Sequence, residues 1–120
     1  MNRFLLDHAH RMIEGREGPT GAWPRAAAFL TRQALEGALD GLWSATLPAM
    51  QGANRSTQMA CLSRILDDHA LIADVRAAWS SLSRACHYHH YEIAPTAAEL
   101  QRWIRQTERL VQALQRTRAP

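Results

Sequence analysis

The sequence predicts an all-α fold, a four- to five-helix up-and-down bundle that forms a single domain over residues 1–120. Apolar residues recur at intervals of three and four in several windows, and no window shows the alternation of a strand. Clusters of glycine, proline and small polar residues separate these windows. With 47% hydrophobic and 21% charged residues, a chain of this length can build one core and is too short for two.

The first helix is expected over residues 3–14 with Asn2 as its N-cap, and a glycine-rich connection at 15–21 ends it. The second helix is expected over residues 24–45, because Pro24 suits a first helical turn. Its apolar stripe consists of Ala28, Leu35, Leu39 and Leu42. Small residues that would let a neighbouring backbone approach closely also recur along it: Ala34, Gly37, Ala38 and Gly41.

A loop at 47–54 precedes a short helix, which is expected to begin at Ser56 or Thr57 and to end near Asp67. The longest helical pattern follows and is expected to run from its cap, Asp68, to about Tyr88. Its buried face is predicted to contain Leu71, Ile72, Val75, Ala78, Trp79, Leu82 and Cys86.

The last helix is expected to start after Pro95, because the residue before a proline avoids the α region. Thr96 and Glu99 have the spacing of a capping box. The buried face of this helix is predicted to contain Leu100, Trp103, Thr107, Leu110, Val111 and Leu114.

The composition favours a cytoplasmic protein. No apolar run is long enough to span a bilayer, and residues 1–14 lack the features of a signal peptide. Cys61 and Cys86 lie in apolar helical patterns without a paired spacing, so both are expected to be buried free thiols of a reducing compartment. All 14 basic residues are Arg, which suits phosphate binding but also follows from codon usage in a GC-rich genome. The net charge of +3 permits nucleic-acid binding without indicating it.

One segment, at the end of the longest helix, has the composition of a reactive site. Arg84 is followed by His89 after four intervening residues, and Tyr91 lies two residues further on. A guanidinium can hold a phosphate, and an imidazole can exchange a proton near neutral pH. Three neighbours are candidates for substrate binding or an auxiliary role: His87, Tyr88 and His90.

Helical geometry limits how this segment can act. At ~100° per residue, Arg84 and His89 would lie ~140° apart on an unbroken helix. They can share a pocket if the helix ends between them or if a second subunit contributes one of them. The spacing leaves open which of three imidazoles is presented: His87, His89 or His90. A metal site built from these histidines lacks a fourth ligand and a suitable spacing, so no metal is expected.

The segment also allows a purely structural interpretation. A histidine at the end of an apolar stripe is commonly a hydrogen-bonded core residue. Tyr91 and Glu92 would then simply anchor a helix end.

The Arg-x4-His-x-Tyr motif at the end of a long helix resembles the signature of the HEPN superfamily of small all-α domains. Residues 26–36 resemble the early helix of that family, and residues 91–114 resemble its closing segment, so the resemblance covers about 24–114. The sequence differs from many active members at Ala85, where a polar residue is frequent.

The resemblance implies a homodimeric, metal-independent endoribonuclease, of the kind that serves as a toxin or defence factor, with no cofactor. His89 would be the general base for an RNA 2′-OH, Arg84 would hold the phosphate, and Tyr91 would position the substrate. The long helix or the small-residue face of the second helix would form the dimer interface.

Part of the family is paired with a nucleotidyltransferase, an antitoxin-like partner that silences the domain by attaching AMP to a motif tyrosine. Here that tyrosine would be Tyr91 or Tyr88. The alternative is a non-catalytic HEPN-like module that binds a nucleotide, a nucleic acid or a protein partner through the same cleft.

Overall fold

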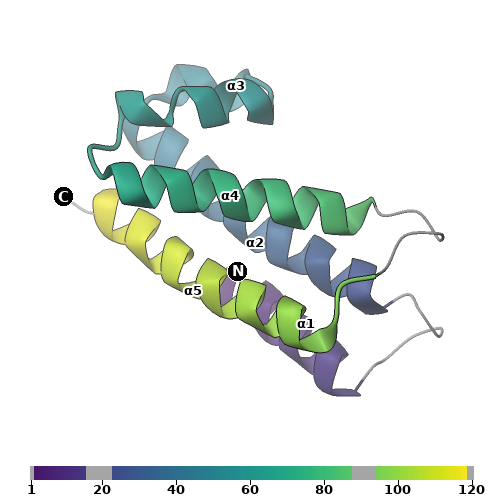
Figure 1. Cartoon of the computed structure of the whole chain (residues 1–120). Coiled ribbons are helices and arrows are strands. Elements are labelled where there is room, and N and C mark those ends of the chain that lie inside the picture. The colour runs from purple at the N-terminus through teal and green to yellow at the C-terminus, as the bar shows by residue number, and fades with distance from the viewer. Residues whose placement is uncertain (1, 16–22, 88–93, 119–120) are drawn as a thin grey trace.

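The computed structural model describes residues 2–15, 23–87 and 94–118, and within these ranges it is an all-α bundle without strands, as the sequence predicts. Five α-helices are present in this part of the chain: α1 (Asn2–Gly15), α2 (Trp23–Thr46), α3 (Arg55–Ala60), α4 (His69–Cys86) and α5 (Ala97–Arg118) (Figure 1). Two 3-10 turns flank α3, η1 (Pro48–Gly52) and η2 (Leu62–Arg64). No helix within these ranges is both long enough and apolar enough to cross a membrane.

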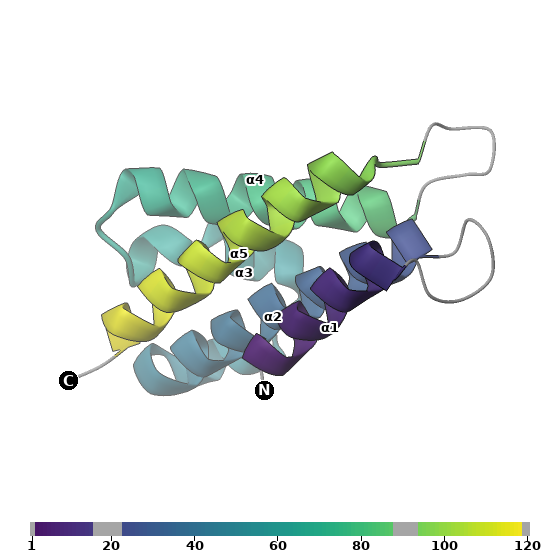
Figure 2. The same ribbon diagram turned by 90° about the horizontal axis from the view of Figure 1, so that it is seen from below.

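The four long helices, α1, α2, α4 and α5, run alternately up and down in chain order (Figure 1). Helix α2 packs against each of the other three, and Figure 2 shows α1 lying along it on the side away from α4. The starts of α2 and α5 and the end of α4 therefore lie at one end of the bundle (Figure 1).

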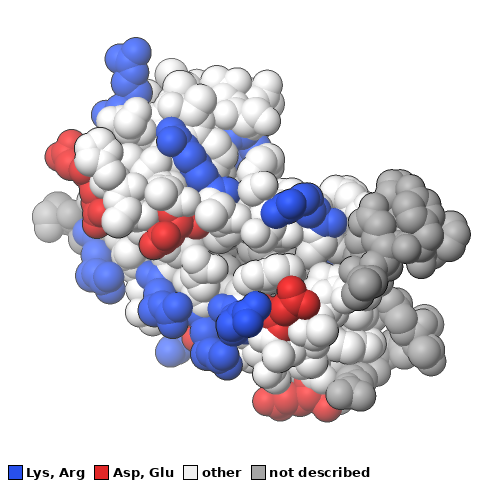
Figure 3. All heavy atoms as spheres, in the orientation of Figure 1, with Lys and Arg blue, Asp and Glu red and all other residues white. Residues whose placement is uncertain are grey.

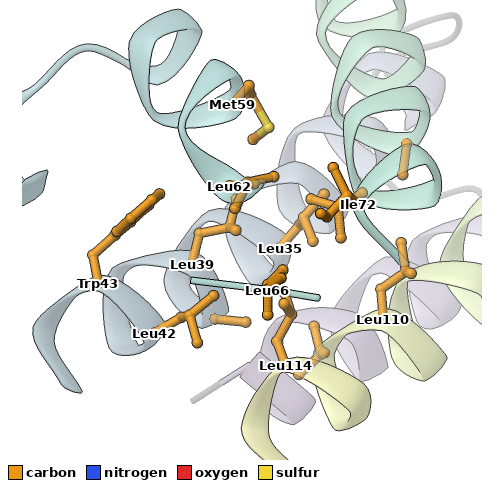
Figure 4. Packing of buried hydrophobic residues seen from close by; sticks show 14 of the residues in the cluster. Leu35, Leu39, Leu42, Trp43, Met59, Leu62, Leu66, Ile72, Leu110 and Leu114 are labelled. Carbon is orange, nitrogen blue, oxygen red and sulfur yellow. The ribbon is translucent and has the colours of Figure 1, made fainter. Parts of the chain in front are cut away.

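Two buried clusters hold the bundle together. The larger one joins α2, α3, α4 and α5, and the side chains of Leu35, Leu39, Leu42 and Trp43 in it are 0% exposed (Figure 4). The smaller cluster joins α1 to the first half of α2 and to the facing ends of α4 and α5. Alanines dominate its α2 side, which lets α1 approach closely: Ala27, Ala28 and Ala34. The apolar stripe predicted for the second helix is thus confirmed.

The predicted start and end of the short helix are wrong. Helix α3 begins at Arg55 because Asn54 is its N-cap, with the Asn54 Oδ1 atom accepting a 2.8 Å hydrogen bond from the Thr57 N–H. It ends at Ala60, where the Cys61 backbone turns to φ −94° and ψ 2°, and η2 continues the chain. The first helix also differs slightly, since α1 already includes Asn2.

Both caps predicted for the two long C-terminal helices are confirmed. Asp68 Oδ1 accepts a hydrogen bond of 3.1 Å from the Leu71 N–H at the start of α4. At the start of α5, the Glu99 N–H donates to Thr96 Oγ1 and the Thr96 N–H donates to Glu99 Oε1, each over 3.1 Å. This reciprocal pair satisfies two of the free donors at the helix start.

Replacement of the α5 cap is expected to weaken the fold modestly. Thr96→Ala should lower the free energy of unfolding by about 1 kcal/mol, because the Glu99 N–H loses its acceptor. Thr96→Ser keeps the hydroxyl and is the matched control. Urea unfolding followed by circular dichroism measures the difference, and equal stability of the Ala and Ser variants would contradict the capping role.

Candidate phosphate-binding site at the end of α4

Helix α4 ends inside the predicted motif. Its last residue is Cys86, and His87 has left the helix with φ −121° and ψ 19° while its N–H donates to the Arg84 carbonyl over 3.1 Å. The helix is therefore shorter than the sequence suggested. Because it ends between Arg84 and His89, the angular separation expected on an unbroken helix does not apply to this pair.

Two motif side chains lie in the described part of the chain, and both are exposed: Arg84 and His87. Arg84 is in the last turn of α4, on the side opposite its buried face, and it has no hydrogen-bond or ion-pair partner among the residues described. A guanidinium in this state has all five donors available to an anion. The other predicted site residues lie outside the described residues: Tyr88, His89, His90 and Tyr91.

The opposite side of the same helical turn anchors it to the core. Ala85 and Cys86 are each 6% exposed and belong to the cluster that includes α1 and the start of α5. A polar residue at position 85, as is frequent in the family that the motif resembles, would be buried here. The Ala85 side chain therefore contributes packing, and a direct substrate contact from it is not expected.

Burial raises the pKa of the Cys86 thiol, whereas the nearby cations of Arg32 and Arg25 lower it and the Glu36 carboxylate raises it further. The net effect raises the pKa of this thiol above its ordinary range, so the thiol is neutral at pH 7. These three influences also show that charged groups of α2 lie close to the end of α4. Cys86 is thus a packed thiol and not an activated nucleophile.

Polar side chains of α2 and α4 meet along the contact between these helices, near the C-terminal end of α4. We call this set the polar seam, and it contains Arg32, Glu36, Trp79 and Ser83. Trp79 Nε1 donates to Glu36 Oε2 over 3.1 Å, and Arg32 Nε lies 3.9 Å from Glu36 Oε1. The Arg32 guanidinium carbon is 5.7 Å from the centre of the exposed Phe29 ring. One turn beyond Trp79, the buried Ser83 Oγ has no hydrogen-bond partner within the described part of the chain, and neither has the buried Arg32 Nε. Buried polar atoms without a hydrogen bond to a described residue therefore occur on both helices near the turn that carries the motif, although Arg32 keeps its ion pair with Glu36.

The same seam continues away from the motif into a network that secures α3. Arg55 Nη1 donates to Asp40 Oδ1 and to Gln58 Oε1, each over 2.8 Å, and Arg55 Nε lies 3.4 Å from Glu36 Oε2. Gln58 Nε2 in turn donates to the Met50 carbonyl over 2.8 Å. The partners of these side chains are all internal, so we assign the network a structural role. No local pattern in the sequence predicts this network.

No three His, Cys, Asp or Glu side chains within the described ranges come together in a way that could hold a metal ion. Both cysteines are free, but only Cys86 is buried, and the prediction that Cys61 is also buried is wrong. Cys61 is half-buried because it follows α3, where the chain bends toward η2.

The two thiols are expected to react at very different rates. A thiol reagent such as a disulfide dye should modify Cys61 first at pH 8, because Cys86 is both shielded and held protonated. Cys61→Ser should remove the fast phase, whereas Cys86→Ser should leave it intact. A fast phase that survives Cys61→Ser would contradict the burial of Cys86.

Comparison with known proteins adds no relative from which a role could be carried over: no protein-family model, curated protein or solved structure matches this chain. The structure defines a class, an all-α bundle whose long helix α4 carries in its last turn an arginine without a partner in the described ranges. The chemistry of that helix end is therefore the feature that indicates a function.

Proposed function

We propose that this chain is a homodimeric, metal-independent endoribonuclease of the HEPN type. The observation that carries the proposal is the state of Arg84, an exposed guanidinium in the last turn of α4 that has no partner among the residues the structure describes. The helix ends two residues later, and the exposed imidazole of His87 follows at once. Cleavage of RNA by attack of its own 2′-OH requires at least a general base for that hydroxyl and a cation that stabilises the charge on the phosphate. An imidazole and a guanidinium can fill these two roles.

In the proposed reaction, an imidazole removes the proton from the 2′-OH, and the 2′ oxygen attacks the adjacent phosphorus. The P–O5′ bond breaks, and the departing 5′ oxygen takes up a proton. One product ends in a 2′,3′-cyclic phosphate and the other begins with a 5′-OH. The Arg84 guanidinium stabilises the negative charge that builds on the phosphate oxygens. We assign the base to His89, with His87 and His90 as the alternatives.

The dimer is proposed to form through the outer face of α4 so that two Arg84 side chains approach each other. Of the four small residues predicted to allow close approach to α2, Ala34 and Ala38 are already buried in the chain's own core, which leaves Gly37 and Gly41 half-exposed. This favours α4 over the small-residue face. A credible interface should bury about 1,000 Å² or more in total. Light scattering that gives a monomer mass at high micromolar concentration would contradict the dimer.

The direct test is to incubate the purified protein with total cellular RNA in the presence of EDTA. We expect discrete fragments whose 3′ ends carry a 2′,3′-cyclic phosphate. RNA that is bound but left intact would contradict the enzyme and favour the non-catalytic binding module. Cleavage that appears only when a divalent metal is added would contradict the proposed mechanism.

A further inference from the structure

Helix α5 carries a row of four exposed arginines on its outer side (Figure 3). At ~100° per residue their directions fall within about 60° of one another. The buried residues of α5, such as Ile104 and Leu114, point in the opposite direction. We call this set the arginine row, and its members are Arg102, Arg105, Arg109 and Arg116.

The arginine row is not neutralised by the described part of the chain. None of its members has a hydrogen bond or an ion pair with a described residue. Asp68 and Asp74 line the same groove between α4 and α5 as Arg109 and Arg116, yet no pair comes within salt-bridge distance. Both acidic residues of α5 have partners of their own: Glu108 is bound by a histidine of α1 over 2.9 Å, and Glu99 accepts hydrogen bonds from the Thr96 cap. The row therefore presents a net positive surface.

The arginine row begins at the end of the bundle that carries Arg84 and extends along α5 toward the other end. Helix α5 begins at the end of the bundle where α4 ends, so Arg102 in its second turn lies at the same end as Arg84 (Figure 1). Figure 3 shows arginines over both helices on the same face of the molecule. From Arg102 to Arg116 the row extends ~21 Å at 1.5 Å per residue. This length matches about six stacked nucleotides at ~3.4 Å each.

We propose that the arginine row binds the phosphates of single-stranded RNA and guides the strand to Arg84. The choice of RNA rests on the proposed function. A flexible single strand can follow a straight row of cations, whereas the deep, narrow major groove of an RNA duplex does not admit a helix. An anionic membrane is a poorer fit, because membrane-surface helices need an exposed apolar face and that face of α5 is buried in the bundle.

The experiment measures binding without cleavage. A fluorescent, fully 2′-O-methylated oligonucleotide of about 12 residues, which has no 2′-OH to attack, is titrated with the full-length protein over a range of salt concentrations. Arg105→Gln/Arg109→Gln should weaken binding equally for pyrimidine and purine sequences. It should also reduce the log–log salt slope by about 1.4, at ~0.7 per lost phosphate contact.

The matched control is Arg11→Gln/Arg64→Gln, which removes the same charge from two exposed arginines outside the row. Its slope should equal that of the parent. The proposal is overturned if the row variant has the same salt slope as the parent. It is also overturned if the row variant and the control variant lose binding and salt slope to the same extent. The two proposals can fail separately: RNA cleavage with a normal slope in the row variant refutes the row alone, and binding through the row without cleavage refutes the enzyme alone.

Discussion

Arg84→Ala is expected to reduce RNA cleavage by about 10²–10³-fold while leaving the fold intact. The loss follows from the position of the guanidinium, which is exposed in the last turn of α4 and has no partner among the described residues. Truncation therefore removes no described internal contact, and the melting temperature should stay nearly unchanged. Fragment yield from a labelled RNA and a thermal melt measure the two quantities.

Two further variants test whether the loss of cleavage is specific to the guanidinium of Arg84. Arg64→Ala removes another exposed arginine from η2, beyond the opposite end of α4, and should retain full cleavage. Arg84→Lys keeps the charge but loses the two-pronged geometry, so we expect partial activity. If Arg84→Ala instead melts well below the parent, or cleaves as well as Arg64→Ala does, Arg84 is not the phosphate clamp.

Trp43→Ala is expected to lower the free energy of unfolding by about 3–5 kcal/mol. Trp43 is 0% exposed in the larger cluster, where α2 packs against α3, α4 and α5 (Figure 4). Its removal leaves a cavity that the surrounding leucines fill only in part. Urea unfolding followed by circular dichroism measures the loss.

Trp43→Phe separates the packing of this side chain from its polar atom. The Trp43 indole N–H is buried and has no hydrogen-bond partner among the described residues, and such a group costs about 1–3 kcal/mol. Phenylalanine removes that N–H and keeps most of the ring, so its variant should be much more stable than the alanine variant. Equal destabilisation by Phe and Ala would contradict the assignment of Trp43 as a core anchor.

The sequence predicted those parts of the fold that depend on local patterns. The buried stripe of α2 and the caps at Asp68 and Thr96 require only periodicity and residue type, and all are confirmed. Errors arose where two local signals compete. Asn54 and Ser56 are both good caps, and the structure uses Asn54. On α5, Ile104 is fully buried where Trp103 was predicted, because Trp103 lies at the edge of the cluster.

The surroundings of the candidate site could be predicted only in part. Arg84 and His87 were identified from the motif, but the end of α4 at Cys86 was not. The contact between Glu36 and Trp79 joins residues 43 positions apart, and no pattern in one sequence reveals such a pair. The members of the arginine row recur at helical spacing in the sequence, but whether the other helices supply partners for them depends on tertiary packing that the sequence does not show.

The most direct test of the account is the cleavage of an RNA that carries a single 2′-deoxynucleotide immediately 5′ of a mapped cut site. The account predicts that cleavage at this bond disappears in EDTA, because the attacking 2′-OH is missing, while neighbouring sites are still cut. Persistent cleavage at the deoxy position, or a protein that cleaves no RNA at all, would contradict it.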